Sequence, residues 1–149
     1  MGYPTLQYSR TEVDQAGTTL VDGTVIDDLL DDALAVISNF RSAHSFPLNT
    51  LTMGLRRRSK VVSPNCLVAQ RIKRLSSIGA KLRRFPGLRL SQMQDIGGCR
   101  SVLNSVEEVQ AVVEKFRNSS IRHQLARTDD YMVQPKPSGY RGVHLYSRA

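Results

Sequence analysis

Residues 71–84, R-I-K-R-L-S-S-I-G-A-K-L-R-R, constrain the fold more than any other stretch of this 149-residue chain. In one continuous helix Lys73 and Lys81 would share a face, whereas Arg71 would point roughly 120° away, at 100° per residue. Arg71 would then enter the apolar stripe of the helix, where burying an unpaired guanidinium is costly. A strand over residues 66–73 removes the conflict, because Arg71 and Lys73 then project from the same side.

The helix that follows this strand begins afresh at Ser76 or Ser77, a favourable pair of N-cap residues, and runs to about Arg84. Ser77 then lies at the positive end of a helix, with Lys81 one turn further on. Backbone N–H groups and a lysine in this arrangement favour a bound phosphate. The alternative is an ordinary basic helix on a solvated surface.

The remaining patterns predict helices and short strands. The expected elements are a helix over 24–42 whose buried face begins at Ile26, a helix over 49–61, a strand from Asp95 to Leu103, a helix capped by Ser105 and Glu108, and strands from about Ile121, over 131–134 and over 140–146. We expect residues 1–22 to form an irregular arm with a short helix near residues 11–16, residues 24–62 to be helical, and residues 63–149 to hold the chemistry. The chain is long enough for a single domain with its own core.

The charge of the chain indicates anionic partners. Twenty-one lysines and arginines face 13 acidic residues, a net charge of +8, and residues 55–89 carry nearly all of the positive excess. No apolar run approaches the ~20 residues that would span a bilayer. The first residues lack a basic segment followed by an apolar one, so we expect no signal peptide. We therefore expect a cytoplasmic protein without membrane contact, in which Cys66 and Cys99 are reduced.

Two further motifs carry groups suited to nucleotide chemistry. Asp95 lies in M-Q-D-I-G-G-C-R, and an aspartate beside glycine is either a turn residue or a ligand for a hard cation such as magnesium. The run P-K-P-S-G-Y-R-G-V-H ends at His144, and alternation over residues 140–146 places Tyr140, His144 and Tyr146 on one face of a strand. Gly142 lies between Tyr140 and His144 and leaves that face open for a flat ligand. A plain hairpin with strand aromatics is the simpler interpretation of this motif.

Taken together, the three motifs resemble the synthetase domain of the RelA/SpoT alarmone enzymes. Two N-terminal runs, residues 39–49 and 53–58, extend the resemblance to the small single-domain toxin branch of that family. The resemblance implies an α+β fold, a mixed β-sheet flanked by helices in the nucleotidyltransferase-like manner. The sheet is expected to be incomplete at the C terminus, because the family's last strands have no counterpart in these 149 residues.

The resemblance also assigns roles to individual residues. Arg71, Lys73, Ser77 and Lys81 are expected to hold the ATP donor, and Arg71 with Arg100 to stack on its adenine. Asp95 is expected to bind Mg²⁺, while Tyr140 stacks on the base of the acceptor. Lys136, Arg141 and His144 are expected to line the acceptor and phosphate region. Asp95, Tyr140 and His144 thus form the expected catalytic set.

The implied reaction is transfer of a pyrophosphoryl group from ATP to a ribose 3′-hydroxyl, as in ppGpp synthesis during the stringent response. The acceptor would be GDP, GTP or, as in tRNA-modifying toxins of toxin–antitoxin pairs, the CCA end of tRNA; an antitoxin would then be a partner. A basic track for tRNA is available, with a solvated basic surface as the equal alternative: Arg56, Arg57, Arg58, Lys60, Arg83 and Arg84. The family's second acidic ligand, in an E-x-Q-x-R strand, has no counterpart here. The alternative function is therefore a truncated, catalytically inactive homologue that binds nucleotide or RNA as a regulatory fragment.

Overall fold

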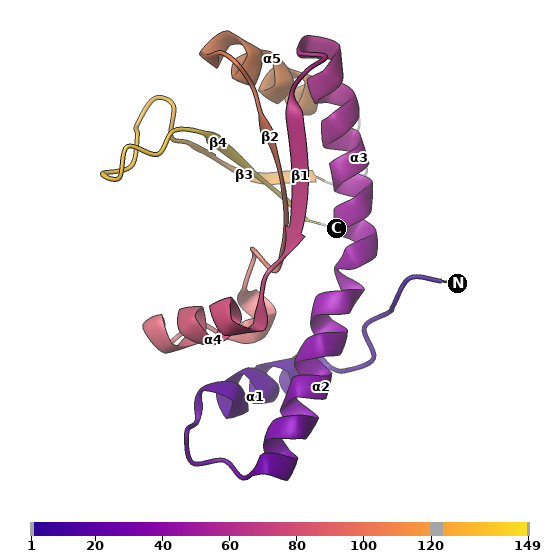
Figure 1. Ribbon diagram of the computed structural model, residues 1–149, viewed down its shortest axis with the longest axis vertical. Helices are drawn as coiled ribbons and strands as arrows, with labels where there is room; N and C mark the ends of the chain where they lie inside the picture. The colour runs from indigo at the N-terminus through magenta and orange to yellow at the C-terminus, as the bar shows by residue number, and fades with distance from the viewer. Residues whose placement is uncertain (1, 120–123, 149) are drawn as a thin grey trace. The chain divides into compact units, whose positions relative to one another are not determined.

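The protein is described by a computed structural model that covers residues 2–119 and 124–148. Its elements in chain order are α1 (Arg10–Val21), α2 (Asp27–Ala43), α3 (Ser45–Val62), β1 (Leu67–Ile72), α4 (Leu75–Arg84), a 3₁₀ turn η1 (Leu90–Gln92), β2 (Gly97–Val102), α5 (Val106–Arg117), β3 (Gln124–Asp130) and β4 (Val143–Arg148) (Figure 1). The expected α+β class is confirmed. Among the described residues the strands form two pairs, β1 with β2 and β3 with β4, where we expected one mixed sheet.

The residues divide into two compact units. The first combines the chain up to Thr50 with Gln70–Cys99, and the second combines Leu51–Ala69 with the chain from Arg100 onward. That the whole chain acts as one domain stays a prediction. None of the helices in the described residues combines the length and the apolar character needed to cross a membrane.

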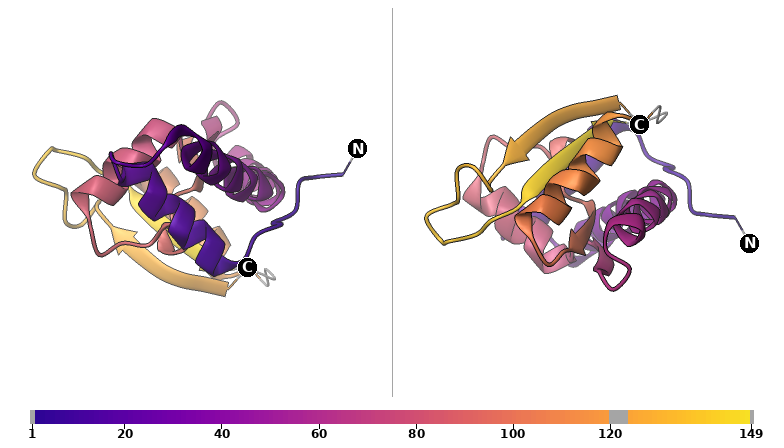
Figure 2. Two further views of the ribbon diagram at one scale, coloured as in Figure 1. Left: turned by 90° about the horizontal axis from the view of Figure 1, so that it is seen from below. Right: turned by 90° about the horizontal axis from the view of Figure 1, so that it is seen from above.

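The first unit is built around helices α1 and α2, which lie side by side (Figures 1 and 2). Its buried core draws on α1, α2, α4 and the segment around η1: Val13, Ala16, Ala33, Ile37, Phe40, Ile78, Leu82, Leu90, Met93 and Ile96. Gly17 permits a close approach of α1 to Leu90, because a Cβ there would lie 2.8 Å from the Cβ of Leu90. Ile26 was wrongly expected to begin the buried face of α2, since it precedes the helix and is 73% exposed.

Helix α1 occupies most of the segment that we expected to be an irregular arm. It begins with a capping box: Ser9 Oγ accepts from the Glu12 backbone N–H, and Glu12 Oε2 accepts from the Ser9 N–H. Gly17 does not interrupt this helix, because it lies against the core rather than in a turn. The helix therefore extends well beyond the short stretch expected near residues 11–16.

The change from strand to helix after residue 73 is confirmed, with β1 followed by α4. The N-cap is Arg74, not Ser76 or Ser77, so both serines lie in the first turn of α4. The Arg74 side chain makes no capping hydrogen bond. The first-turn N–H groups of α4 therefore receive no side-chain cap, which leaves them suited to an anionic ligand.

The second unit contains the antiparallel pair of β3 and β4, seen at the yellow end of the chain in Figure 2. The register places Arg127 opposite Tyr146 and Asp129 opposite His144, with a bulge between Leu125 and Arg127. The expected start of a strand at Ile121 lies outside the described residues.

The strand expected over residues 131–134 was wrong, because this segment is a turn. The Asp130 carboxylate accepts hydrogen bonds from the backbone N–H groups of Met132 and Val133, at 2.9 and 3.2 Å. Asp at this position thus satisfies the turn backbone and ends β3.

The other helices agree with the sequence patterns apart from their ends. Helices α2 and α3 lie in the region expected to be helical, with only His44 between them. Ser105 caps α5 as expected, by accepting from the Glu108 N–H at 3.2 Å. The Glu108 carboxylate accepts from the Asn104 N–H instead of the Ser105 N–H. Only one of the two hydrogen bonds of the expected capping box is therefore formed, and the other is shifted by one residue.

Candidate nucleotide-binding site

Three charged residues that lie far apart in the sequence meet in the first unit. Lys73 Nζ is 2.8 Å from Asp95 Oδ2, and Lys81 Nζ is 2.7 Å from Asp95 Oδ1. We call these three residues the Lys–Asp–Lys cluster. Lys73 follows β1, Lys81 lies in the last turn of α4, and Asp95 precedes β2, so one helix and two connecting segments hold the cluster together.

The ionisation of Asp95 follows from this arrangement. Partial burial on its own would raise the pKa of Asp95, but the hydrogen bonds and positive charges of Lys73 and Lys81 outweigh it and lower the pKa below its usual value. Asp95 is therefore a carboxylate at neutral pH. With two cations on one anion, the cluster has a net charge of +1 and favours a polyanion in its surroundings.

Backbone hydrogen bonds fix the position of Lys73. Its N–H donates to the carbonyl of Ile96 at 2.7 Å, and its own carbonyl accepts from Arg41 Nε at 2.9 Å. The side chain of Lys73 is only 10% exposed, whereas those of Lys81 and Asp95 are 33% and 41% exposed. Lys73 thus forms the inner side of the cluster, and Lys81 with Asp95 its outer side.

The cluster fits a divalent cation only together with a nucleotide. Both oxygens of Asp95 are hydrogen-bonded to lysines. In the described part of the chain no group of three or more Asp, Glu, His or Cys side chains could hold a metal ion. A single carboxylate leaves most of the octahedral positions of Mg²⁺ to water and to phosphate oxygens, as is common for this ion.

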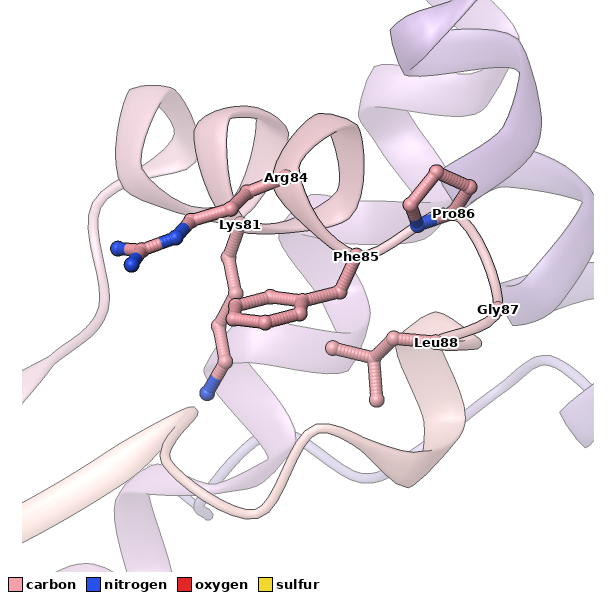
Figure 3. A pocket seen from close by; sticks show the side chains of 6 residues that line it. All are labelled: Lys81, Arg84, Phe85, Pro86, Gly87 and Leu88. Atoms are coloured by element: carbon pink, nitrogen blue, oxygen red, sulfur yellow. The ribbon is translucent and has the colours of Figure 1, made fainter.

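Two adjoining surface hollows of the first unit share Lys81, Arg84 and Phe85. The smaller, of about 330 Å³, is lined by these three residues with Ala80 and Asp95. The larger, of about 680 Å³, extends from the same three residues to Leu88. Figure 3 shows the Phe85 ring between the Lys81 side chain and Leu88, with the Arg84 guanidinium turned away from Leu88. Cationic and aromatic side chains therefore lie next to the Lys–Asp–Lys cluster.

The other residues expected to bind the donor are exposed. Arg71 lies on β1 and Ser77 in the first turn of α4. Arg100 lies on β2 and belongs to the second unit. The expected stacking of Arg71 and Arg100 on an adenine stays a prediction.

The second unit gathers the aromatic residues of the P-K-P-S-G-Y-R-G-V-H motif and its neighbours. Tyr140 Oη lies 3.0 Å from His144 Nε2, and His144 Nδ1 lies 3.4 Å from Tyr146 Oη. Lys136 Nζ lies 5.6 Å from the centre of the Tyr140 ring. The expectation that Tyr140, His144 and Tyr146 share a face agrees with these contacts, although Tyr140 itself lies before β4 rather than within it. We call Tyr131, Tyr140, His144, Tyr146 and Lys136 the aromatic cluster.

The face next to Gly142 is not open, because the ring of Tyr140 lies over it. A Cβ on Gly142 would be 3.0 Å from Tyr140 Oη and 3.3 Å from Cζ. Glycine lets the ring lie this close while it reaches His144, which differs from the expected role of leaving room for a ligand. Tyr140 remains 47% exposed, so its other side is available for stacking.

The chemistry of His144 is set by its surroundings. Burial lowers the pKa of His144 below its usual value, and the positive charge of Lys136 lowers this pKa further. His144 is therefore neutral at pH 7 and can accept a hydrogen bond at one ring nitrogen. Arg141 is exposed and its guanidinium lies 3.4 Å from the Met132 carbonyl, across the loop.

The six residues of the possible RNA track differ in their surroundings. Arg56, Arg57, Lys60, Arg83 and Arg84 are exposed. Arg58 is half-buried, with its guanidinium 4.6 Å from the centre of the Phe116 ring and a 3.0 Å hydrogen bond to the Gly54 carbonyl. Lys60 donates to the Pro64 carbonyl at 2.6 Å. Arg58 therefore contributes to packing within its unit, and the other five are better placed for a ligand.

Several contributing residues were missed by the sequence reasoning: Arg41, Phe85, Asp129 and Tyr131. Arg41 and Phe85 carry no local signal, because their contacts depend on tertiary packing. Tyr131 had a signal in the pairing of strands around the turn, which places its aromatic ring opposite those of the neighbouring strand.

Comparison with known proteins agrees with the motifs. A family model described as "Region found in RelA / SpoT proteins" matches residues 70–148, which is more than half of the chain and includes both clusters. The GTP pyrophosphokinase YjbM of Bacillus subtilis (strain 168) is 37% identical to this chain over 92 residues, which amount to 56% of this chain and 40% of that relative. The chain thus spans less than half the length of this relative.

Proposed function

This chain belongs to the RelA/SpoT family, and from that premise we propose that it is a pyrophosphokinase, which transfers a pyrophosphoryl group from ATP to a ribose 3′-hydroxyl. The observation that carries the proposal is the Lys–Asp–Lys cluster, in which Lys73 and Lys81 are both within 2.8 Å of Asp95 oxygens. Two lysines around one carboxylate match the needs of a triphosphate and its divalent cation.

The donor would bind through its phosphates in the first unit. Lys73, Lys81 and the uncapped first turn of α4 at Ser77 would contact the phosphate oxygens. Mg²⁺, held by Asp95 and by phosphate oxygens, would supply neutralisation of the charge on the phosphates. Arg84 and Phe85 border the same hollow as Asp95 and would contact the parts of the donor beyond Lys81.

The acceptor would bind through its base in the second unit. The exposed side of Tyr140 would stack on the base, a contact worth about 1–3 kcal/mol. His144 is neutral at pH 7 and would accept a hydrogen bond from a ribose hydroxyl in exchange for its contact with a tyrosine hydroxyl. Lys136 and Arg141, both exposed, would contact phosphates of the acceptor. The hydroxyl oxygen would attack the β-phosphorus of ATP, and AMP would leave.

We propose a guanine nucleotide, GDP or GTP, as the first acceptor class, because the relative at 37% identity is a GTP pyrophosphokinase. The CCA end of tRNA is the other acceptor, and Arg56, Arg57, Arg83 and Arg84 would then bind its phosphates. If tRNA is the acceptor, we propose that the protein acts as a toxin in the cytoplasm and has an antitoxin as its partner.

One observation supports a second candidate function, that of a nucleotide-binding protein without transfer activity. Asp95 is a single carboxylate, and both of its oxygens are hydrogen-bonded to lysines. A protein of this kind would bind ATP at the Lys–Asp–Lys cluster and release it unchanged.

The two functions are separated by incubating the full chain with labelled ATP, Mg²⁺ and either GDP or deacylated tRNA, beside a Tyr140→Ala control. We expect label to move to one of the acceptors, AMP to form in equal amount, and the control to be strongly reduced. Binding of ATP without transfer to either acceptor would support the second candidate. Absence of both binding and transfer would contradict both.

A further inference from the structure

Tyr131 lies at the centre of the aromatic cluster, although the sequence motifs did not include it. It follows β3, it is half-buried, and its backbone N–H donates to the Gly142 carbonyl at 2.8 Å. This hydrogen bond continues the pairing of β3 and β4 beyond the last register pair, Asp130 with Val143. The backbone of Tyr131 is therefore fixed to the base of the loop that carries Lys136 and Tyr140.

The ring of Tyr131 lies next to three of the side chains that we assign to the acceptor nucleotide, those of Tyr140, His144 and Lys136. Its centre lies 5.1 Å from that of His144 and 6.2 Å from that of Tyr140, with interplanar angles of 80° and 68°. Lys136 Nζ lies 4.5 Å from the Tyr131 ring centre, closer than the 5.6 Å to that of Tyr140. The ammonium group is thus held against both tyrosine rings, chiefly by that of Tyr131.

The hydroxyl of Tyr131 contributes less than the ring. It lies 3.4 Å from Asp129 Oδ2, which is long for an O–H···O hydrogen bond. Asp129 is already bound by Arg127, at 2.7 and 2.8 Å. Replacement by phenylalanine should therefore preserve the function of this position, whereas loss of the aromatic ring should not.

Lys136 and Tyr140 are exposed and lie in the loop between β3 and β4, where Gly139 has a φ of +80°. Side chains in such a loop lose conformational freedom when they bind a ligand, and this loss lowers affinity unless they are already ordered. The ring of Tyr131 supplies this order, since it touches both Lys136 and Tyr140 before any ligand is present.

We propose that Tyr131 is a positioning residue, which holds Lys136 and Tyr140 in place to receive the base and phosphate of the acceptor nucleotide. The inference rests on the proposed function in assigning the acceptor to Tyr140. It adds that acceptor affinity depends on a ring that need not itself touch the acceptor.

The test measures GDP and deacylated tRNA binding by calorimetry, and initial rates of AMP formation, for the wild type, Tyr131→Phe and Tyr131→Leu. We expect Tyr131→Leu to weaken binding of the acceptor and raise its KM by roughly fivefold to tenfold, with kcat and the KM for ATP within about twofold of wild type. For Tyr131→Phe, the acceptor affinity, the acceptor KM, kcat and the KM for ATP should all lie within about twofold of the wild-type values.

A Lys136→Met variant and the double variant with Tyr131→Leu show whether the ring acts through Lys136. A positioning role predicts that Tyr131→Leu costs less acceptor affinity in the Lys136→Met background than in the wild type. Circular dichroism checks that each variant is folded. If Tyr131→Leu proves unfolded, the Lys136→Met and Tyr131→Phe variants still test the inference, because the first should weaken acceptor binding and the second should not.

The outcomes separate the inference from the proposed function. If the wild type transfers pyrophosphate and folded Tyr131→Leu binds the acceptor as tightly, the inference is overturned and the function stands. If the wild type binds GDP or tRNA without transfer, and Tyr131→Leu weakens that binding, the function is overturned and the inference stands. If the wild type binds neither acceptor, both are overturned. Equal changes in kcat and both KM values would mark a general structural role and overturn the inference.

Discussion

Lys81 and Asp95 form a 2.7 Å ion pair that connects the last turn of α4 with the loop before β2. Lys73 shares the same carboxylate at 2.8 Å. Asp95 therefore balances two lysines in the free protein. By our proposal it also contributes an oxygen to the cation that accompanies a nucleotide. Binding of the nucleotide would replace carboxylate by phosphate as the partner of each lysine.

The first prediction concerns the stability that Asp95 contributes. Asp95→Asn leaves Lys73, whose side chain is 10% exposed, without its anion. We expect the free energy of unfolding in urea to fall by about 1–3 kcal/mol, less than for a fully buried pair because Asp95 is 41% exposed. The double variant Lys73→Met with Asp95→Asn should recover part of this loss, because no buried charge then remains unpaired.

The stability difference between the wild type and Asp95→Asn should also depend on pH, in a direction that the pKa of Asp95 determines. Since folding lowers the pKa of Asp95 below its usual value of 3.8, the stabilisation is present above that pH and is lost as the pH falls through the lower pKa of the folded protein. The stability difference between wild type and Asp95→Asn should therefore be largest near neutral pH and shrink below pH 3.8. Equal stability of the two proteins at pH 7 would contradict this account.

A second prediction concerns magnesium. Both oxygens of Asp95 are hydrogen-bonded to lysines, so we expect millimolar Mg²⁺ alone to leave the unfolding temperature unchanged. Mg²⁺ with α,β-methylene-ATP should raise the unfolding temperature more than the analogue with a chelator does, because the phosphates then supply the missing ligands. An equal rise with Mg²⁺ alone would show a preformed metal site and contradict the prediction.

A third prediction tests the contact between Tyr140 and Gly142. Gly142→Ala places a Cβ 3.0 Å from Tyr140 Oη, so the ring must shift. We expect this shift to disturb the contact with His144 and the stacking surface. We expect the affinity for GDP to fall by roughly fivefold, since losing an aromatic stacking surface costs on the order of 1 kcal/mol. Gly98→Ala is the matched control, because a Cβ there meets nothing within 4 Å. The prediction is wrong if both variants bind GDP as the wild type does.

A fourth prediction separates packing from RNA binding on α3. Arg58→Ala removes the contact with Phe116 and should lower the free energy of unfolding by about 0.5–2 kcal/mol. Arg57→Ala, at an exposed position, should change stability by less than about 0.5 kcal/mol. If tRNA is the acceptor, Arg57→Ala should also weaken tRNA binding and reduce its dependence on salt concentration. Unchanged tRNA binding by Arg57→Ala would favour a solvated basic surface.

The sequence predicted the strand-to-helix change at residue 73 because an unpaired Arg71 could not be buried, whereas a common site for Lys73 and Lys81 was expected only from the family resemblance. It did not predict the N-cap at Arg74, since both serines are better caps by composition. Tertiary contacts decided that boundary: Lys73 is fixed by Ile96 and Arg41 from other segments.

The arrangement of the aromatic cluster could also be predicted only in part from the sequence. Alternation placed Tyr140 and His144 together, but the turn after β3 depends on Asp130, whose carboxylate competes with strand pairing for the backbone N–H groups. Because that turn was missed, Tyr131 was assigned to a strand and its place among the other rings was missed as well. That the two clusters serve one active site stays a prediction.

The most direct test of the central claim is calorimetric binding of Mg²⁺ with α,β-methylene-ATP, in which the bond to be broken is blocked. We predict that the wild type binds the analogue and that Lys81→Met binds it at least about tenfold more weakly, the loss of one charge-assisted contact to phosphate. Lys115→Met, an exposed change on α5, should bind as the wild type does. Equal affinity of the wild type and Lys81→Met would show that the Lys–Asp–Lys cluster is not the donor site.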